Sequence, residues 1–238
     1  MAGGKSGSSS TAFTHSAIRG DLVGWFSGAE PHLWPRATLA RHLERLDALV
    51  AGLGARLPQA ACVDERSRAM VAVYPGGGTG YLRHCDNSRS ASEGERCNGR
   101  RLTAILYLND GWQLDDGGEL RLFEPYDPAK AESTLNELRE WVAAHRDAEE
   151  SLVARELPKL RARLRSVSLE DSPPLCDVAP LSGRLLLFFA DYRVPHQVLP
   201  AQARRRAITV CCCLDGTRRR ACPMGPRTVD GSALLMLW

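Results

Sequence analysis

Short runs of β-branched, aromatic and other apolar residues dominate the chain and predict a series of β-strands. Gly-rich and Pro-rich turn signals separate these runs, for example PGGG at 75–78, DDGG at 115–118 and SG at 182–183. Eight short strands in one chain indicate a mainly β fold, either a sandwich or a jelly roll. The predicted strands are 69–74, 79–84, 101–109, 119–123, 176–180, 184–190, 196–200 and 206–214.

Two other regions follow the period of a helix. Leucines recur at helical spacing over about 36–56, which predicts an amphipathic helix that lies against the sheet. Apolar residues also recur among many Glu and Arg over about 128–172, which predicts a helical insertion between two strands, with Pro158 as its break or kink. The basic run at 155–165 is either a docking surface or, as such runs more often are, a solvated helix face.

The same pattern places one domain between two tails. We expect a flexible Gly-, Ser- and Thr-rich tail at 1–16, a single domain at 17–215 and a C-terminal tail at 216–238 that packs on the domain or frays. No run approaches the roughly 18 apolar residues of a membrane span, and the start MAGGKSGSSSTAF lacks the apolar stretch of a secretory signal. We therefore expect a cytoplasmic protein with no membrane partner, and Arg218–Arg220 leaves a nuclear address as an alternative.

Charge and cysteine content narrow the function classes. With 31 basic and 28 acidic residues the net charge is +3, which gives no global field for a nucleic-acid backbone, so we expect no nucleic-acid partner. Eight cysteines are present, and Cys211–Cys213 are consecutive in a predicted strand, where neighbours point to opposite faces. This arrangement indicates reduced thiols used as small apolar residues rather than a disulfide framework.

A candidate metal site comes from three residues at strand ends. His84 and Asp86 close one predicted strand, and His196 opens a later one. Residues two apart on a regular strand share a face, so His196 must approach from another strand in the interior. Two imidazoles and one carboxylate leave three positions free on an octahedral metal, as in non-haem Fe(II) oxygenases. A zinc site with His₂Asp and a water is the alternative.

A candidate anion site lies on the last predicted strand. Arg205, Ala207, Thr209 and Cys211 follow at period two and share one face. If that face points to the metal, a buried guanidinium needs an anion, and its planar fork fits a carboxylate. A dicarboxylate such as 2-oxoglutarate would chelate iron through its keto acid end and reach Arg205 with its far carboxylate. Tyr107 is a candidate second donor.

Several motifs in the same order make the chain resemble the hypoxia-inducible-factor prolyl hydroxylases, a branch of the 2-oxoglutarate and Fe(II) dioxygenases. The resemblance covers roughly 17–127 and 175–215 and implies a double-stranded β-helix, or jelly-roll, core with flanking helices. The motifs that carry it are AIRGDLVGW (17–25), MVAVYPGGGTGYLRHCDN (70–87), RLTAILYLN (101–109), RLLLFFADYRVPHQVLPA (184–201) and RRRAITV (204–210).

The resemblance also implies roles for individual residues. The implied iron ligands are His84, Asp86 and His196. The residues implied to bind the co-substrate or lie near the metal are Arg205, Tyr107, Tyr74 and Thr209. The residues implied to close over the site, line its pocket or face the substrate are Asp21, Trp25, Tyr81 and Arg100.

Together these features predict an enzyme that uses Fe(II), 2-oxoglutarate and O₂, with ascorbate as a supporting reductant, to 4-hydroxylate a prolyl residue in a protein substrate. Cys211 and Cys212 stand where the family usually has aromatic residues, so we expect a wider pocket wall and a looser sequence requirement. The alternatives are the same chemistry on another residue or on a small molecule, a zinc hydrolase, and a silent binding module. The oligomeric state stays open.

Overall fold

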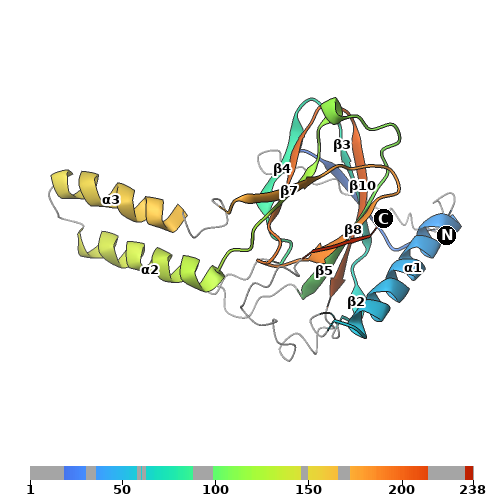
Figure 1. Cartoon of the computed structure of the whole chain (residues 1–238), viewed down its shortest axis with the longest axis horizontal. Helices are drawn as coiled ribbons and strands as arrows, with labels where there is room; N and C mark the ends of the chain where they lie inside the picture. Colours follow the sequence, from blue (N-terminus) through green and yellow to red (C-terminus); the bar gives the residue numbers. More distant parts are fainter. Residues whose placement is uncertain are drawn as a thin grey trace, which may run out of the picture.

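The computed structural model describes residues 19–30, 36–57, 60, 63–87, 99–145, 150–165, 172–213 and 234–237 (Figure 1). The predicted tail at 1–16 lies outside the described residues, and so does most of 216–238. Among the described helices, none is both long and apolar enough to cross a bilayer.

The larger of two β-sheets has seven antiparallel strands. The strand β10 lies at its centre between β3 and β5, and β2 pairs with one end of β10. From one edge to the other, the order is β1 (Leu22–Phe26), β3 (Ala69–Tyr74), β10 (Arg205–Cys213), β5 (Arg100–Tyr107), β8 (Leu185–Phe189) and β11 (Leu234–Leu237), with β2 (Glu65–Arg66) off this path.

The smaller sheet has four antiparallel strands and faces the larger one. A single core cluster contains buried residues of both sheets, among them Leu122 and Val198 from the small sheet and Leu186 and Val210 from the large one. This confirms the predicted mainly β fold of the double-stranded β-helix type. The order is β4 (Thr79–His84), β9 (His196–Ala201), β6 (Leu120–Phe123) and β7 (Pro174–Val178), and a short 3₁₀ turn, η3 (Leu114–Asp116), precedes β6.

The helix α1 (Arg36–Gly54) confirms the helix predicted at about 36–56. Its residues Leu43, Leu46 and Val50 are three and four positions apart, so they share one side of the helix. All three are buried and belong to the core cluster of the sheets. Burying such an apolar stripe stabilises a helix more than its intrinsic propensity does.

The predicted helical insertion is a hairpin of two helices, α2 (Pro128–Ala144) and α3 (Glu150–Arg165), that lie side by side and project from the sheets (Figure 1). Of the break or kink predicted at Pro158, the break is wrong, because α3 continues on both sides of that residue. Proline removes one backbone hydrogen bond of a helix, and here the helix tolerates that loss.

Three strands lie outside the eight predicted ones: β1, β2 and β11. The four residues of β11 belong to the C-terminal tail that we expect to pack on the domain or fray, and they do pack on it, as a strand that pairs with β8 and extends the large sheet. Each of these strands is only two to five residues long. Their pairing partners lie far away in the sequence, so a local pattern of apolar residues does not reveal them.

Candidate metal and co-substrate site

The two histidines of the candidate site are direct neighbours across two strands. His84 is the last residue of β4 and His196 the first residue of β9, and the two are paired in register. Their ring centroids are 4.4 Å apart. Strand pairing therefore brings together two residues that are more than a hundred positions apart in the sequence, as predicted.

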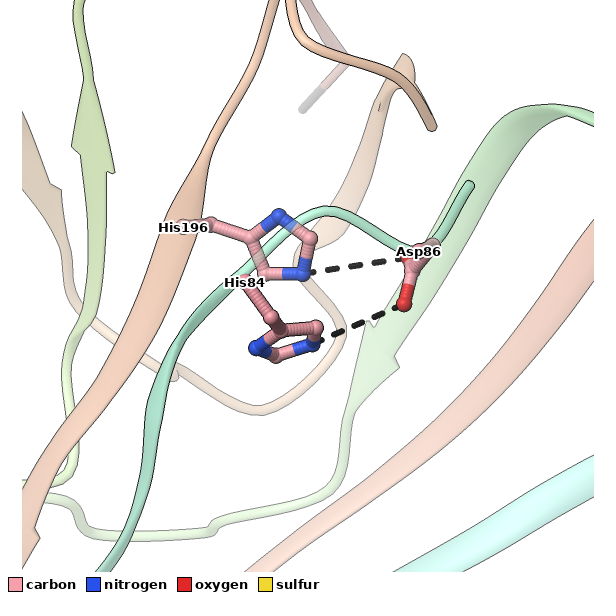
Figure 2. Close-up of side chains that lie close together, drawn as sticks. All are labelled: His84, Asp86 and His196. Atoms are coloured by element: carbon pink, nitrogen blue, oxygen red, sulfur yellow. Dashed lines mark ion pairs between the residues drawn. The ribbon is translucent and has the colours of Figure 1, made fainter. Parts of the chain in front are cut away.

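The side chain of Asp86 lies beside the two histidines, but a bend places it there rather than a regular strand. Regular strand alternation was expected to place its side chain beside His84, but β4 ends at His84 and Asp86 lies in the bend that follows. Figure 2 shows both imidazole rings turned toward its carboxylate. The carboxylate oxygens lie 3.6 Å from Nε2 of His84 and 3.8 Å from Nε2 of His196.

The hydrogen bonds of the two imidazole rings leave one nitrogen of each ring free to bind a cation. Nδ1 of His84 lies 2.7 Å from the carbonyl oxygen of Leu82, and Nδ1 of His196 lies 3.0 Å from that of Val194. Because a carbonyl only accepts, each Nδ1 carries the proton and each Nε2 presents a lone pair. Potential ligand atoms of the three residues lie within 4.8 Å of one another, so the set fits a divalent metal.

Electrostatics keep these groups in the forms that bind metal. Burial opposes ionisation of Asp86, but the imidazoles of His196 and His84 and the hydroxyl of Thr103 hold the pKa of this carboxyl below its usual range. Burial, assisted by His84, lowers the pKa of His196 to about 4. At neutral pH the carboxylate is therefore ionised and His196 is neutral.

The triad opens into a pocket between the two sheets, with a volume of about 430 Å³ including the part open to solvent. Apolar side chains such as Met70, Ile105 and Val198 form much of its wall together with charged and polar groups, as in pockets for small ligands. The lining residues are Arg19, Met70, Ala72, Tyr74, Tyr81, His84, Asp86, Thr103, Ile105, Leu120, His196, Val198, Arg205, Ala207 and Thr209.

Arg205 lies in this pocket on β10 and is only 4% exposed. Tyr74 is its partner on β3, and Tyr107 on β5 pairs with the residue two positions further along β10. The centres of the two tyrosine rings lie 5.0 and 5.1 Å from the guanidinium carbon. Both tyrosines therefore flank the guanidinium, and their binding to a co-substrate stays a prediction.

The polar groups around Arg205 are incompletely satisfied. Its Nε donates to the carbonyl of Gly118 at 2.7 Å, and no Asp or Glu within the described ranges forms an ion pair with it. The hydroxyl of Tyr107 is buried and finds no hydrogen-bond partner among the described residues. A buried cation beside a buried free hydroxyl fits a carboxylate supplied by a ligand.

Gly118 is a functional position that the sequence showed only as part of a turn. Its φ is +77°, and a Cβ there would lie 2.9 Å from Cδ of Arg205. Glycine is thus required both for the backbone conformation and for the close approach of the arginine. The carbonyl that orients Arg205 therefore depends on the second glycine of the DDGG turn.

Tyr81 contacts the triad directly, whereas Asp21 contacts the pocket residue Arg19. The ring of Tyr81 stacks on His84 with centroids 3.8 Å apart, and the guanidinium of Arg19 lies 4.8 Å from the Tyr81 ring. Asp21 is fully buried and does not line the pocket, but it holds Arg19 by two hydrogen bonds of 2.6 and 2.7 Å. Arg19 lines the pocket and was not among the predicted residues.

The other predicted residues are divided between the pocket and its surroundings. Thr209 lines the pocket, whereas Trp25 lies on β1, is 44% exposed and is not part of the lining. Arg100 donates to the backbone carbonyl of Asp86 at 3.4 Å and is also outside the lining. Substrate contacts of Trp25 and Arg100 stay predictions.

Cys211 is buried outside the pocket lining, which gives no support to the wider pocket wall that the sequence predicts at this residue.

Thr103 and Ile105 are further pocket residues that sequence reasoning missed. Both lie on β5 at even spacing from Tyr107, so strand alternation from that tyrosine identifies their common face. Thr103 donates a hydrogen bond of 2.6 Å to Asp86. That contact crosses from one sheet to the other and has no sequence signal.

Comparisons with known proteins agree with this geometry. Prolyl hydroxylase EGLN3 from Homo sapiens is 34% identical over 194 residues, which are 81% of this chain and 58% of that protein. This chain therefore spans less than two thirds of that relative's length. Its resemblance to prolyl hydroxylases, first seen in the motifs, is confirmed.

Two solved structures resemble the fold. A prolyl hydroxylase in complex with a hypoxia-inducible-factor peptide from Trichoplax adhaerens has a TM-score of 0.55 and 28% identity, over 85% of this chain and 66% of that one. A prolyl-4-hydroxylase from Pseudomonas putida has a TM-score of 0.55 and 25% identity, over 86% of this chain and 78% of that one.

The model of the 2OG-Fe(II) oxygenase superfamily matches residues 69–211, which contain the metal triad and Arg205. The chain belongs to the 2OG-Fe(II) oxygenase superfamily.

Proposed function

We propose that this protein is a 2-oxoglutarate- and Fe(II)-dependent prolyl hydroxylase that acts on a protein substrate. The observation that carries the proposal is one pocket that holds both the triad of His84, Asp86 and His196 and the buried Arg205, which has no carboxylate partner among the described residues. A zinc hydrolase or a silent binding module leaves Arg205 and the free hydroxyl of Tyr107 without a role.

Different residues of the pocket would bind the metal and the co-substrate. When bound, Fe(II) supplies the chemistry that couples O₂ and 2-oxoglutarate to substrate hydroxylation, giving succinate and CO₂. His84, Asp86 and His196 would hold the metal, and Arg205 with Tyr107 would bind the far carboxylate of 2-oxoglutarate. The apolar wall limits access of water to the reacting groups.

Three points support a prolyl residue in a protein as the substrate. The relative and the two structures described above are named as prolyl hydroxylases, and the Trichoplax structure contains a peptide fragment. Proline has a fixed φ and no backbone N–H, so an extended peptide can present it with little conformational loss. The 4-position of the hydroxylation, the use of ascorbate and the cytoplasmic location stay predictions.

The decisive experiment separates the metal chemistry from the choice of substrate. The protein loaded with Fe(II), but not with Zn(II), is expected to convert 2-oxoglutarate to succinate, and the Asp86→Ala variant is expected to lose this activity. Proline-containing peptides and cell extracts incubated with the Fe(II) enzyme are then searched by mass spectrometry for proline that has gained one oxygen.

The two halves of the experiment fail in different ways. Equal activity with Zn(II), or full activity of Asp86→Ala at saturating Fe(II), would overturn the oxygenase assignment. Succinate formation stimulated by a free metabolite, with no modified proline in any peptide, would overturn only the protein substrate.

A further inference from the structure

Thr103 connects the large sheet to the metal triad of the small sheet. It lies on β5, is 0% exposed, and its Oγ1 donates a hydrogen bond of 2.6 Å to Oδ2 of Asp86. Asp86 itself follows the end of β4 in a bend and has no strand to fix its direction. The hydroxyl of Thr103 is therefore a link between the carboxylate ligand and a rigid central strand.

The position of Thr103 is well determined by its neighbours. On one side it pairs in register with Cys211 of β10, and on the other with Phe188 of β8. Phe188 in turn packs edge-on against His196, with ring centroids 4.9 Å apart. A side chain held between two strands in this way gives a stable reference point for a short hydrogen bond.

The hydrogen bond makes the two oxygens of Asp86 different. Oδ1 lies 3.6 Å from Nε2 of His84, whereas Oδ2 accepts the hydroxyl proton of Thr103 and lies 3.8 Å from Nε2 of His196. A carboxylate on a short side chain rotates about a soft terminal torsion, and a bond to one oxygen opposes that rotation. Valine would fill the same space, so the packing alone does not require a hydroxyl here.

From this geometry we infer that Thr103 is a positioning residue, which holds the Asp86 carboxylate in the orientation that binds the metal. The inference rests on the proposed metal site but not on the substrate. Partners that orient metal ligands typically contribute about 10- to 100-fold to metal affinity. The hydroxyl, rather than the shape of the side chain, supplies this contribution.

The test compares metal binding by variants at Thr103 in the absence of 2-oxoglutarate. Affinity for Mn(II) and Co(II) is measured by calorimetry on the 238-residue protein, and the visible absorption of the Co(II) form reports the ligand geometry. Thr103→Val is expected to bind both metals about 10- to 100-fold more weakly and to shift the Co(II) absorption. Thr103→Ser, which keeps the hydroxyl, is expected to bind with less than the tenfold loss that removal of the partner causes.

Thr134 provides a matched control. It is 5% exposed and its hydroxyl also donates to an acceptor, the carbonyl of Lys130 at 2.9 Å, but it lies on α2 in the projecting hairpin. Thr134→Val makes the same side-chain change at a buried threonine away from the pocket and is expected to leave the metal affinity unchanged. A loss at Thr103→Val alone therefore reports the contact with Asp86.

Other outcomes of the metal-binding measurements would contradict the role of the Thr103 hydroxyl. Unchanged affinity and absorption in a folded Thr103→Val protein would overturn it, and so would an equal loss in Thr103→Ser. If Thr103→Val does not fold, Thr103→Ala must lose the affinity that Thr103→Ser keeps, or the inference is wrong. Failure of the unchanged protein to bind any of these metals would overturn the proposed function together with it.

Discussion

At the scale of single residues, Arg205 shows how a buried charge specifies a ligand. Its guanidinium is bonded to a backbone carbonyl through Nε and flanked by Tyr74 and Tyr107, which offer no counter-charge. A buried arginine in this state is costly until an anion enters. The planar fork then provides two parallel hydrogen bonds to a carboxylate, which lysine does not reproduce.

Arg205→Lys is therefore expected to raise the KM for 2-oxoglutarate about tenfold or more, because loss of a charge-assisted hydrogen bond typically costs about 1.5–3 kcal/mol. Succinate formation measured against the concentration of 2-oxoglutarate checks this. Arg206→Lys is the matched control, since Arg206 is the exposed neighbour on the opposite face of β10. If the change at Arg206 raises KM and the change at Arg205 does not, the wrong arginine has been assigned.

The thiols of Cys211 and Cys212 are expected to be inert in the folded protein. Burial raises the pKa of both to about 12, so at pH 8 only about one thiol in ten thousand is a thiolate. Iodoacetamide should label both residues much more slowly in native protein than in guanidinium-unfolded protein, as followed by peptide mass spectrometry. Native labelling as fast as in the unfolded chain would contradict their role as small apolar core residues.

At the scale of elements, the helical hairpin of α2 and α3 arises at the metal end of the small sheet. It connects Phe123, at the end of β6, to Pro174, at the start of β7, and the same end of the sheet carries His84 and His196. Even so, the two helices pack on each other and project away from the sheets (Figure 1). Among the side chains of α2 and α3 that the structure describes, none lines the pocket.

Replacement of residues 130–170 by a short Gly-Ser linker is therefore expected to preserve metal binding and the slow turnover of 2-oxoglutarate without substrate. The replacement must spare Ser172, because its carbonyl accepts a hydrogen bond of 3.0 Å from Arg83 of β4. Calorimetric metal affinity and succinate formation are the measurements. A folded variant that binds no metal would show that the hairpin shapes the site.

The strand β11 is expected to stabilise the open edge of the large sheet. It pairs with β8, whose residues Leu186, Leu187 and Phe188 are buried, and it satisfies backbone groups along that strand. Replacement of 234–237 by Gly and Ser should lower Tm by several degrees and promote aggregation through the exposed edge. Leu235→Val keeps a strand-forming residue and should leave Tm nearly unchanged; an unaffected Tm in both variants would exclude the stabilising role.

At the scale of the whole molecule, the two sheets contribute different halves of the site. The small sheet provides His84 and His196 at the ends of its strands and Asp86 in the bend after β4, and the large sheet provides Arg205. A ligand that touches both the metal and Arg205 therefore joins the two layers of the sandwich. A ligand that binds only the folded state raises the free energy of unfolding by mass action.

We expect Co(II) to raise Tm and 2-oxoglutarate to raise it further, but only when Co(II) is present. At a ligand concentration of 100 times Kd, the stabilisation is about 2.7 kcal/mol. In Arg205→Lys the increment from Co(II) should remain and the increment from 2-oxoglutarate should shrink, as measured by thermal unfolding at fixed ligand concentrations. Equal increments in both proteins would mean that 2-oxoglutarate does not bridge the sheets.

Several features of this protein follow from its sequence alone. The eight central strands, the helix over about 36–56 and the helical insertion are local patterns, and local period and turn residues specify them. The grouping of His84, Asp86 and His196 and the place of Arg205 in the same pocket were also predictable, because their residue types and the order of the surrounding motifs restrict the chemistry.

Other features were decided only by the tertiary structure. Thr103 and Gly118 act through contacts with Asp86 and Arg205, which are distant in the sequence, and Arg19 lies against the distant ring of Tyr81. The strand β11 exists because β8 offers it an edge. The direction of Asp86 likewise comes from a bend and from the opposite sheet rather than from strand alternation. A sequence pattern reports which face a residue occupies within its own element, whereas these contacts depend on how separate elements pack, and packing is a property of the folded chain.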